Sequence, residues 1–504
     1  MKYMKQILVI ISISMLVTAL TLFPAAADQV EDVSAYLEQE VVTFSLSNGA
    51  SCILLKRDMA PTLSLIISFG VGSADESYDT IGAAHLLEHM LFKGTDTIGT
   101  KNYQEEKKIL RKIEAVGETI DRLSLTNPGN QMLPDLKKRL KELQEEHKKY
   151  IVHSPYDKIY TRAGGVGFNA STSRDKTAYY IELPNSKLEL WAKLESERIR
   201  EPVLREFYLE RETVYEERLM RYESSPVSKL FEDFIALSFL AHPYRHPTIG
   251  WKSNIPYLSI NKVRKFYYDH YIPSNMNITI VGNMNVKETR DLLEKYFGSL
   301  PEGRSTGNAI AIEEPRQNIE RRFVLKEDAS PYLVMGWHKP TAPSREDYVF
   351  DVIASLLSDG RSSRLYSTLV MEKKLAAKVN AWNGFPGSRY DNLFVIAAAP
   401  RDPVTPEQLE KEIYKEIEAL AGNCSDEDIQ RVINKTESSI VFDMDTNMGI
   451  ARTLNYYQTV FRDWRYFSTY LDQVRTITCE DVRKVMKEYL VPGNRIVGIL
   501  EKDD

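Results

Sequence analysis

Two segments of the chain repeat one another, one near the middle and one at the end. Residues 263–275 and 482–494 both begin Val-Arg-Lys and both carry proline and asparagine at their eleventh and thirteenth positions. Each runs from an amphipathic helical pattern through a proline turn into strand-forming residues, at 278–281 and at 495–500. A shared helix–turn–strand unit predicts a tandem duplication of two homologous halves.

Strands and helices are mixed in both halves without regular alternation. Apolar runs at 63–69 and 393–397 predict buried strands, and the pattern of 349–357 predicts a helix. This mixture favours an α+β fold over repeated βαβ units.

The boundary between the halves is marked by composition. Residues 301–316 are rich in glycine, proline and polar side chains, which is typical of a linker. A chain of 504 residues is long enough for several domains. We therefore expect an N-terminal domain over 28–300 and a C-terminal domain over 317–504.

Residues 101–151 do not fit the duplication. They are highly charged and helix-forming, and a heptad-like spacing of mostly apolar positions occurs on each side of Asn127-Pro128-Gly129-Asn130. These positions are 109, 113, 116, 120 and 123, then 136, 140, 143, 147 and 150. The pattern predicts a helical hairpin inserted in the first half, with charges that form solvated faces; docking of a partner or substrate is the alternative.

The N-terminus has the pattern of an export signal. Residues 1–27 contain two lysines, no acidic residue, a mostly apolar run and a final Ala-Ala-Ala. This predicts a removable signal peptide and a bacterial periplasmic or secreted protein; an uncleaved membrane anchor is the alternative. No later segment is long and apolar enough to span a membrane, so no span is expected after signal removal.

Charge and cysteine content exclude several kinds of protein. The chain has 65 basic and 71 acidic side chains and a net charge of −6, which argues against nucleic acid as a partner. Its three cysteines, Cys52, Cys424 and Cys479, form neither a disulfide scaffold nor a metal-binding knuckle. They allow one disulfide, but buried free thiols are the expectation.

The strongest local motif is His85-Leu86-Leu87-Glu88-His89. On a helix, residues three and four positions apart share a face, so the two imidazoles and the carboxylate project together. Two histidines suit Zn²⁺, and the carboxylate is free to take a proton from water. The alternative is an ordinary amphipathic helix, but its apolar neighbours would then bury these polar groups without partners.

A third metal ligand is expected from the acidic helix predicted at 209–218. Glu210 and Glu217 lie two helical turns apart and can face the same site. A solvated acidic helix face is the alternative for this segment. Spacing alone does not choose among its glutamates.

The motif and its surroundings resemble those of the inverted-motif zinc peptidases, the family of pitrilysin, insulin-degrading enzyme and mitochondrial processing peptidase. The similarity covers nearly the whole chain after the signal. It is carried by residues 72–76, 85–95, 169–172, 210–217, 242–250 and 295–301. The resemblance implies two homologous domains, each a mixed, mostly antiparallel sheet covered by helices, arranged as a clamshell.

Carried over to this sequence, the resemblance implies a role for each residue of the motif set. His85, His89 and Glu217 would bind one Zn²⁺ per chain, Glu88 would be the general base, and Glu210 would orient a ligand histidine. The segment Asn169, Ala170, Ser171 and Thr172 would be an edge strand that binds the substrate as an added strand. The expected substrates are therefore peptides or unfolded protein segments.

Two features depart from the family. The hairpin lengthens the interval between His89 and Glu217, which changes access to the site more than its geometry. In the second half, Val370 and Ala377 stand where family members carry an Arg and a Tyr that contact the substrate carbonyl. We therefore predict the catalytic subunit of a heterodimer, with a homologous subunit that supplies the Arg/Tyr pair; another donor such as Arg364 is the alternative.

Two other functions compete with this interpretation. One is a non-catalytic scaffold subunit of an assembly, as known for processing-peptidase-like chains. The other is a zinc hydrolase of non-peptide esters or amides. The complete set of His85, Glu88, His89 and Glu217 argues against the scaffold, and the predicted edge strand favours peptides.

Overall fold

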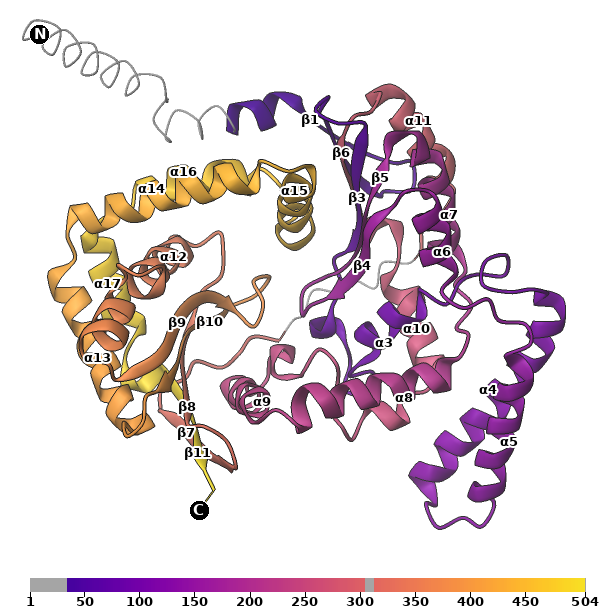
Figure 1. Ribbon diagram of the computed structural model, residues 1–504, viewed down its shortest axis with the longest axis horizontal. Helices are drawn as coiled ribbons and strands as arrows, with labels where there is room; N and C mark the ends of the chain where they lie inside the picture. The colour runs from indigo at the N-terminus through magenta and orange to yellow at the C-terminus, as the bar shows by residue number, and fades with distance from the viewer. Residues whose placement is uncertain (1–33, 304–311, 504) are drawn as a thin grey trace, which may run out of the picture.

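The computed structural model describes residues 34–303 and 312–503. The predicted signal peptide and the middle of the predicted linker, 304–311, lie outside these ranges. The described chain forms two sheets with helices packed on them, one sheet in each half (Figure 1). This confirms the α+β prediction, whereas the exact domain limits stay predictions.

The first sheet has six strands in the order β1-β2-β6-β3-β5-β4. Among its described strands the only parallel pair is β2 with β6, and the other neighbours are antiparallel. The central β3 and β6 are almost entirely buried, because helices cover both of their faces. The strands are β1 (Val41–Ser45), β2 (Ser51–Lys56), β3 (Thr62–Phe69), β4 (Val166–Thr172), β5 (Thr177–Pro184) and β6 (Met276–Gly282).

The second sheet has five strands in the order β7-β11-β8-β10-β9. It repeats the pairing of the first sheet, since β7 and β11 are parallel and the rest antiparallel. Its strands are β7 (Arg321–Glu327), β8 (Tyr332–Lys339), β9 (Ala376–Phe385), β10 (Asn392–Pro400) and β11 (Arg495–Lys502). The repeated segments found in the sequence are the helix that precedes β6 and the helix that precedes β11, each with its proline turn.

Helices supply the rest of each hydrophobic core. The first half contains α3 (Ala83–Met90), α4 (Tyr103–Thr126), α5 (Leu133–His147), α6 (Pro155–Arg162), α7 (Leu188–Arg200), α8 (Phe207–Arg218), α9 (Pro226–Ser238), α10 (Ile260–His270) and α11 (Val286–Phe297). The second half contains α12 (Arg345–Ser358), α13 (Pro406–Asn423), α14 (Asp426–Asp443), α15 (Asn447–Phe461), α16 (Tyr466–Arg475) and α17 (Cys479–Tyr489).

The two halves exchange helices. Helix α9 of the first half packs on β11, β7 and β8 of the second sheet, and α15 of the second half packs on β6 and β3 of the first sheet (Figure 1). Phe234 of α9 is buried against the second sheet, and Leu454 of α15 is buried against the first. Each such side chain contributes about 1.5–3 kcal/mol on burial, so the exchange ties the halves together.

A buried polar cluster accompanies the apolar contact of α15. The Asn455 amide donates hydrogen bonds to Ser68 Oγ at 2.9 Å, Asn277 Oδ1 at 2.9 Å and Thr279 Oγ1 at 3.2 Å. Thr459 lies 2.7 Å from the same Ser68 hydroxyl. These bonds fix how α15 sits on β3 and β6, since a shift would leave buried polar groups unpaired.

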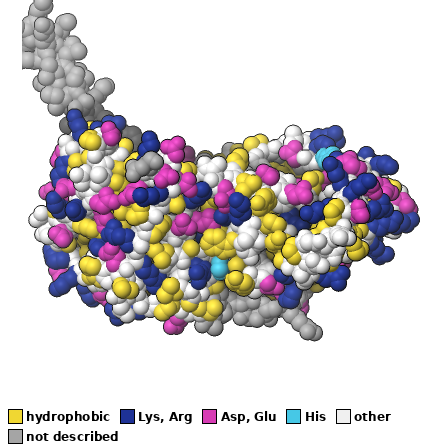
Figure 2. Space-filling model, turned by 90° about the horizontal axis from the view of Figure 1, so that it is seen from below, with side chains coloured by type: hydrophobic (Ala, Val, Ile, Leu, Met, Phe, Trp, Pro, Cys, Tyr) yellow, Lys and Arg dark blue, Asp and Glu magenta, His cyan; other side chains and the backbone are white. Residues whose placement is uncertain are grey.

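The helices α4 and α5 are the two helices expected in 101–151. They pack together and extend from the body of the first half, joined by a turn in which Asn130 N–H donates to the Asn127 carbonyl at 3.0 Å. Their base is fixed by buried Glu106, which contacts His147 at 2.8 Å and Arg205 at 2.7 Å. Basic and acidic side chains crowd this end of the molecule, at the right of Figure 2.

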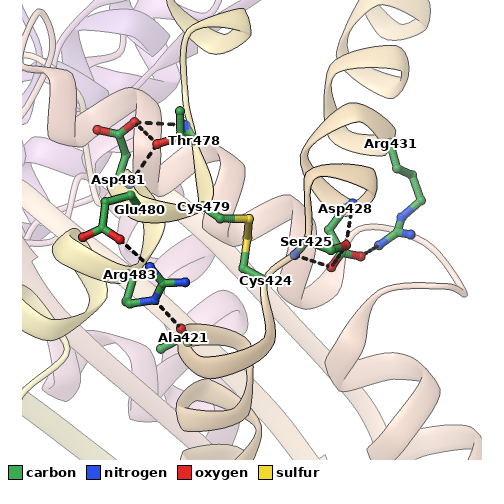
Figure 3. The surroundings of a disulfide bond; sticks show 10 residues. All are labelled: Ala421, Cys424, Ser425, Asp428, Arg431, Thr478, Cys479, Glu480, Asp481 and Arg483. Carbon is green, nitrogen blue, oxygen red and sulfur yellow. Dashed lines mark hydrogen bonds and ion pairs between the residues drawn. A yellow bond between two sulfur atoms is a disulfide. The ribbon is translucent and has the colours of Figure 1, made fainter.

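A disulfide corrects the expectation of three free thiols. Cys424, which follows α13, and Cys479, which begins α17, are bonded, with their Cα atoms 5.6 Å apart (Figure 3). The helix ends meet only in the folded chain, 55 residues apart in sequence, so spacing did not reveal the pair. Cys52 is free and buried, as expected.

Within 34–303 and 312–503, no helix combines the length and apolar character that crossing a membrane requires.

Candidate metal centre

The helix that carries the His-Leu-Leu-Glu-His motif begins at a closely packed glycine contact. Gly82 precedes α3 with φ +95°, and a Cβ added to Gly250 would lie only 2.9 Å from the Gly82 Cα. The buried Glu76 carboxylate accepts from the N–H groups of Gly82 at 2.9 Å and Ala84 at 2.8 Å. A carboxylate there satisfies the free N–H groups at the start of α3 and fixes the helix in place.

One face of α3 meets α8 at the predicted site. His85 Nε2 lies 3.8 Å from Glu217 Oε1, and His89 Nε2 lies 3.5 Å from Glu217 Oε2. One potential ligand atom from each of these three residues lies within 4.8 Å of the other two. The structure thus brings together the two histidines of the sequence motif and the glutamate that the family resemblance implied as the third ligand.

The donor set fits a zinc ion. Two imidazole nitrogens and a carboxylate oxygen are the ligands of many catalytic zinc sites, which keep a further position for water or substrate. The buried His85 Nδ1 has no hydrogen-bond partner in the described chain. Burial and the neighbouring His89 lower the pKa of His85 to about 4, so its ring is neutral and able to bind a metal at neutral pH.

Glu210 lies behind His89, on the side away from Glu217. Its Oε2 is 3.4 Å from His89 Nδ1, and its other oxygen pairs with the Lys93 ammonium, which also lies 3.3 Å from Glu206. Although burial opposes it, pairing with Glu210 and Glu217 raises the pKa of His89 to about 9, so a metal would displace a proton when it binds Nε2 of this ring. Glu210 therefore fixes the ring so that Nε2 faces Glu217.

Glu88 lies between the metal centre and the edge strand β4. Its carboxylate accepts a hydrogen bond from the Thr172 hydroxyl at the end of that strand. Burial raises the pKa of Glu88, and the Thr172 hydrogen bond opposes this effect. A carboxylate with a raised pKa, held beside a metal centre, suits proton transfer.

The predicted substrate segment lies on the free edge of the first sheet. β4 pairs only with β5 among the described strands, and Asn169 and Ser171 are exposed while Ala170 is buried. The outer backbone groups of such an edge can pair with another strand.

Sequence reasoning missed Lys93 and Arg221 at this site. Arg221 lies in a π-helical turn, Leu219–Glu223, and its Nη1 is 2.9 Å from Glu217 Oε1. The spacing of four residues from Glu217 was a usable signal, since such pairs meet on a helix. Lys93 lay inside the quoted motif region, but nothing in its spacing indicated contact with Glu210.

The second half does not supply the missing donors at the aligned positions. Val370 is buried in the core of the second half, and Ala377 lies on β9, so neither side chain can donate a hydrogen bond. Arg364 was the alternative donor, but its Nη1 pairs with Glu416 of α13 at 3.3 Å.

Comparison with known families and structures agrees with this architecture. The model described as insulinase, peptidase family M16, matches residues 52–131 and 156–250. The model described as the peptidase M16 inactive domain matches residues 257–436. The chain belongs to the M16 peptidase family. All five predicted residues of the metal centre lie within the first M16 match, and α5 lies in its gap.

Relatives within the M16 family include named zinc proteases. The chain is 26% identical to the zinc protease PqqE of Helicobacter pylori over 443 residues, which cover 86% of this chain and 96% of the relative. It is 22% identical to the uncharacterized zinc protease YmxG of Bacillus subtilis, over 68% of this chain and 69% of the relative.

Solved structures of similar proteins share the fold. A protease from Helicobacter pylori superposes with a TM-score of 0.77 at 23% identity, covering 92% of this chain and 99% of the other. The periplasmic protease PqqL from Escherichia coli gives a TM-score of 0.68 at 15% identity, covering 92% of this chain and 48% of PqqL. These matches confirm the prediction of two M16-type α+β domains.

Proposed function

We propose that this M16 chain is a zinc-dependent endopeptidase or oligopeptidase. The observation that carries the proposal is the position of Glu88. It lies beside the cluster of His85, His89 and Glu217, and its carboxylate accepts a hydrogen bond from Thr172 of the edge strand β4. A metal centre, a base and a strand-binding edge therefore meet at one place. Names of relatives such as zinc protease PqqE support the same activity.

The residues of the chain divide the chemistry among them. Zn²⁺ held by His85, His89 and Glu217 would polarise the scissile carbonyl and lower the pKa of water at the site. Glu88 takes a proton from that water and delivers it to the leaving amine. The Thr172 hydroxyl holds the Glu88 carboxylate in position, and Glu210 holds the His89 ring.

The edge strand favours a peptide over a small ester or amide. Asn169, Ala170, Ser171 and Thr172 offer backbone groups that an extended peptide can pair with, and Thr172 brings that peptide to Glu88. Only short peptides and unfolded segments present such a strand. This argument makes the non-peptide hydrolase the weaker function.

A Glu88→Gln variant tests the proposed activity. It should keep bound zinc, because Glu88 is not among the three clustered ligands, and should lose at least about hundredfold in peptide cleavage. Zinc content is measured by elemental analysis and cleavage with a quenched fluorescent peptide library. The exposed Glu216→Gln on α8 is the matched control. Equal turnover by E88Q and the parent chain would refute Glu88 as the base.

We further propose that a homologous subunit completes the enzyme. The positions that carry Arg and Tyr in the family hold Val370 and Ala377 here, and loss of one transition-state donor costs about 2.7–4 kcal/mol. The purified chain alone should therefore cleave peptides slowly, and a co-purifying homologue with the Arg/Tyr pair should accelerate it. Full activity of the isolated chain, checked for partners by mass spectrometry, would contradict the heterodimer.

The scaffold function makes the opposite prediction for metal. A scaffold has no need for His85, Glu88, His89 and Glu217 in this arrangement, and it would bind no stoichiometric zinc. One zinc per chain, together with E88Q-sensitive cleavage, separates the enzyme from the scaffold.

Export to an oxidising compartment accords with the disulfide. Cystine bonds persist in the periplasm and outside cells and are rare in the cytosol, and the similar protein PqqL is described as periplasmic. We propose periplasmic or secreted localisation, with the mature chain starting at Asp28. N-terminal sequencing of the chain from fractionated cells tests this, because an uncleaved anchor would leave Met1 in the membrane fraction.

A further inference from the structure

A pocket of about 440 Å³ adjoins the metal centre where the two halves meet. Arg221 and Tyr222 line it from the π-helical turn after α8, and Phe231 lines it from α9. Arg174 lines it from the turn after β4, and Phe385 from the end of β9 in the second half. The pocket is therefore built from both halves, and its residue Arg174 lies two positions after the end of the edge strand β4.

The pocket carries a local excess of positive charge. Arg174, Arg221 and Arg245 line it, against one carboxylate, Glu232. Glu232 is already engaged, because Arg218 Nη2 lies 2.8 Å from both of its oxygens. In a chain of net charge −6, this site is unlike the average surface and favours an anion.

Two of the arginines have no acidic partner. Arg174 Nε donates to the Tyr244 carbonyl at 3.0 Å, and Arg245 Nη1 donates to the Leu240 carbonyl at 2.8 Å. Neither guanidinium forms an ion pair with any residue in 34–303 or 312–503. Burial lowers the pKa of Arg174, and the nearby Tyr222, Asp175 and Glu232 only partly oppose this effect. A bound carboxylate would offset the cost of this burial.

The pocket lies within reach of a peptide held at Glu88. Arg174 follows Thr172 by two residues, in the tight turn between β4 and β5, so their Cα atoms are at most about 7 Å apart. On the other side, Arg221 Nη1 is 2.9 Å from the ligand candidate Glu217. A peptide residue one to three positions from the scissile bond can therefore place its side chain among these arginines.

Aromatic walls complete the pocket. The rings of Phe231 and Phe385 lie 6.0 Å apart, and Tyr222 adds a third aromatic surface. Such walls pack against the methylene groups of a long acidic side chain, while guanidinium groups bind its carboxylate, often with two parallel hydrogen bonds.

We propose that this arginine pocket binds a carboxylate of the peptide substrate and so gives the peptidase a preference for acidic peptides. This inference rests on the proposed function for its substrate class. The carboxylate has two sources, a Glu or Asp side chain near the scissile bond and a free C-terminus. In both cases the carboxylate must come within hydrogen-bond distance of Arg174 and Arg245.

Matched peptides test the pocket without any need for turnover. A library places Glu or Gln at each position within three residues of a cleavage site, with a free or amidated C-terminus. Binding to the zinc-loaded E88Q chain is measured by fluorescence anisotropy, and cleavage by the parent chain separately. The favoured Glu peptide should bind about tenfold to hundredfold more tightly than its Gln counterpart, the range of a charged hydrogen bond. If amidation rather than Gln abolishes tight binding, the source is the C-terminus.

Variants assign the preference to the arginines. Arg174→Met and Arg245→Met should each bring the ratio of acidic to neutral peptide affinity towards one. Arg122→Met, on the exposed tip of α4 far from α9 in Figure 1, is the charge-matched control and should keep the ratio. Both arginines are half-buried and their loss can also affect folding, so two variants are compared and thermal melting monitors the stability of each.

The outcomes separate this inference from the proposed function. The arginine pocket is refuted if the parent chain binds the acidic and neutral peptide of every pair with equal affinity. It is also refuted if both variants fold and keep the affinity ratio of the parent, and either result holds even if peptides are cleaved. Selective binding of carboxylates without cleavage by the parent chain, either alone or with its homologous subunit, would instead leave the pocket intact and remove the peptidase.

Discussion

The Nδ1 atom of His89 lies 3.4 Å from Oε2 of Glu210. This contact orients the ring so that the opposite nitrogen, Nε2, faces Glu217 at 3.5 Å. Glu210 of α8 also pairs with Lys93, which lies three residues after the end of α3. His89 and Lys93 therefore both contact the same carboxylate. The orientation of the ligand His89 thus depends on Glu210 and Lys93, which are not themselves metal ligands.

Removal of the Glu210 charge should weaken metal binding without abolishing it. Glu210→Gln leaves His85, His89 and Glu217 in place but loosens the His89 ring, and we expect zinc affinity to fall about tenfold to hundredfold. Competition with a zinc-sensitive dye measures the change. Glu212→Gln, exposed on the same helix, is the control. Equal affinity in both variants would show that Glu210 has no positioning role.

Chelation should stop peptide cleavage but leave the chain folded. The cores of both halves are apolar and do not depend on a metal. Zinc present at a thousand times its dissociation constant should add about 4 kcal/mol to stability. Thermal melting with and without zinc measures this gain, which Glu217→Gln should reduce. Unfolding by the chelator alone would contradict a catalytic rather than structural role for the metal.

Loss of the disulfide should lower the stability of the chain without changing the metal centre. The Cys424–Cys479 bond closes a loop of 55 residues, for which chain-entropy arguments give about 4 kcal/mol as an upper value. The double variant C424S/C479S should unfold at lower urea concentration yet bind zinc with parental affinity, because α3 and α8 lie in the other half. Cys52→Ala is a control for thiol removal. A change in zinc affinity would show coupling that the fold does not indicate.

Asp351 should produce a characteristic pH dependence. Burial and the nearby Asp347 raise the pKa of Asp351 to about 6, although Asn383 and Tyr470 donate hydrogen bonds to it. Between about pH 4 and 6 the folded chain then binds this proton more readily than the unfolded chain, so its contribution to stability falls as pH rises. Relative to the parent, Asp351→Asn should gain stability across this window.

Urea unfolding of both proteins at several pH values measures that difference. The exposed Asp443→Asn is the control and should track the parent. Parallel curves for the parent and D351N would contradict the raised pKa.

Loss of the Asn455 side chain should destabilise the contact between α15 and the first sheet. Asn455→Ala removes the amide that donates to three buried oxygens of β3 and β6. Ser68 then keeps Thr459 and Asn277 keeps Thr279 as hydrogen-bond partners, so we expect a loss of about 1–3 kcal/mol in total. We expect a lower urea midpoint than for the exposed control Asn434→Ala. Equal midpoints would show that α15 is held by its apolar face alone.

Local patterns in the sequence predicted much of this molecule. The spacing of His85, Glu88 and His89 defines one face of α3 whatever surrounds it, and the repeated proline turns precede β6 and β11 as expected. The sequence pattern offered Glu217 as one of several possible third metal ligands, and only the resemblance to a family selected it. The structure then brought its carboxylate to both histidines.

Features that depend on packing between distant segments were not predictable. Cys424 and Cys479 come together only because α13 and α17 pack side by side. The arginine pocket draws Arg174, Arg245 and Phe385 from separate segments of the chain, and no periodicity links them. Helices α9 and α15 have ordinary amphipathic patterns. Nothing in those patterns indicates that each helix packs on the sheet of the other half.

The exchanged helices also have a consequence for how the chain can be divided. Separate expression of the two halves would leave an apolar face bare on each sheet and an apolar helix without a partner on each fragment. Each fragment alone would therefore tend to aggregate, whereas the two together should reassociate as a stable noncovalent pair. A gene cut between the halves would thus encode an obligate complex, with the covalent connection needed for assembly efficiency rather than for the final architecture.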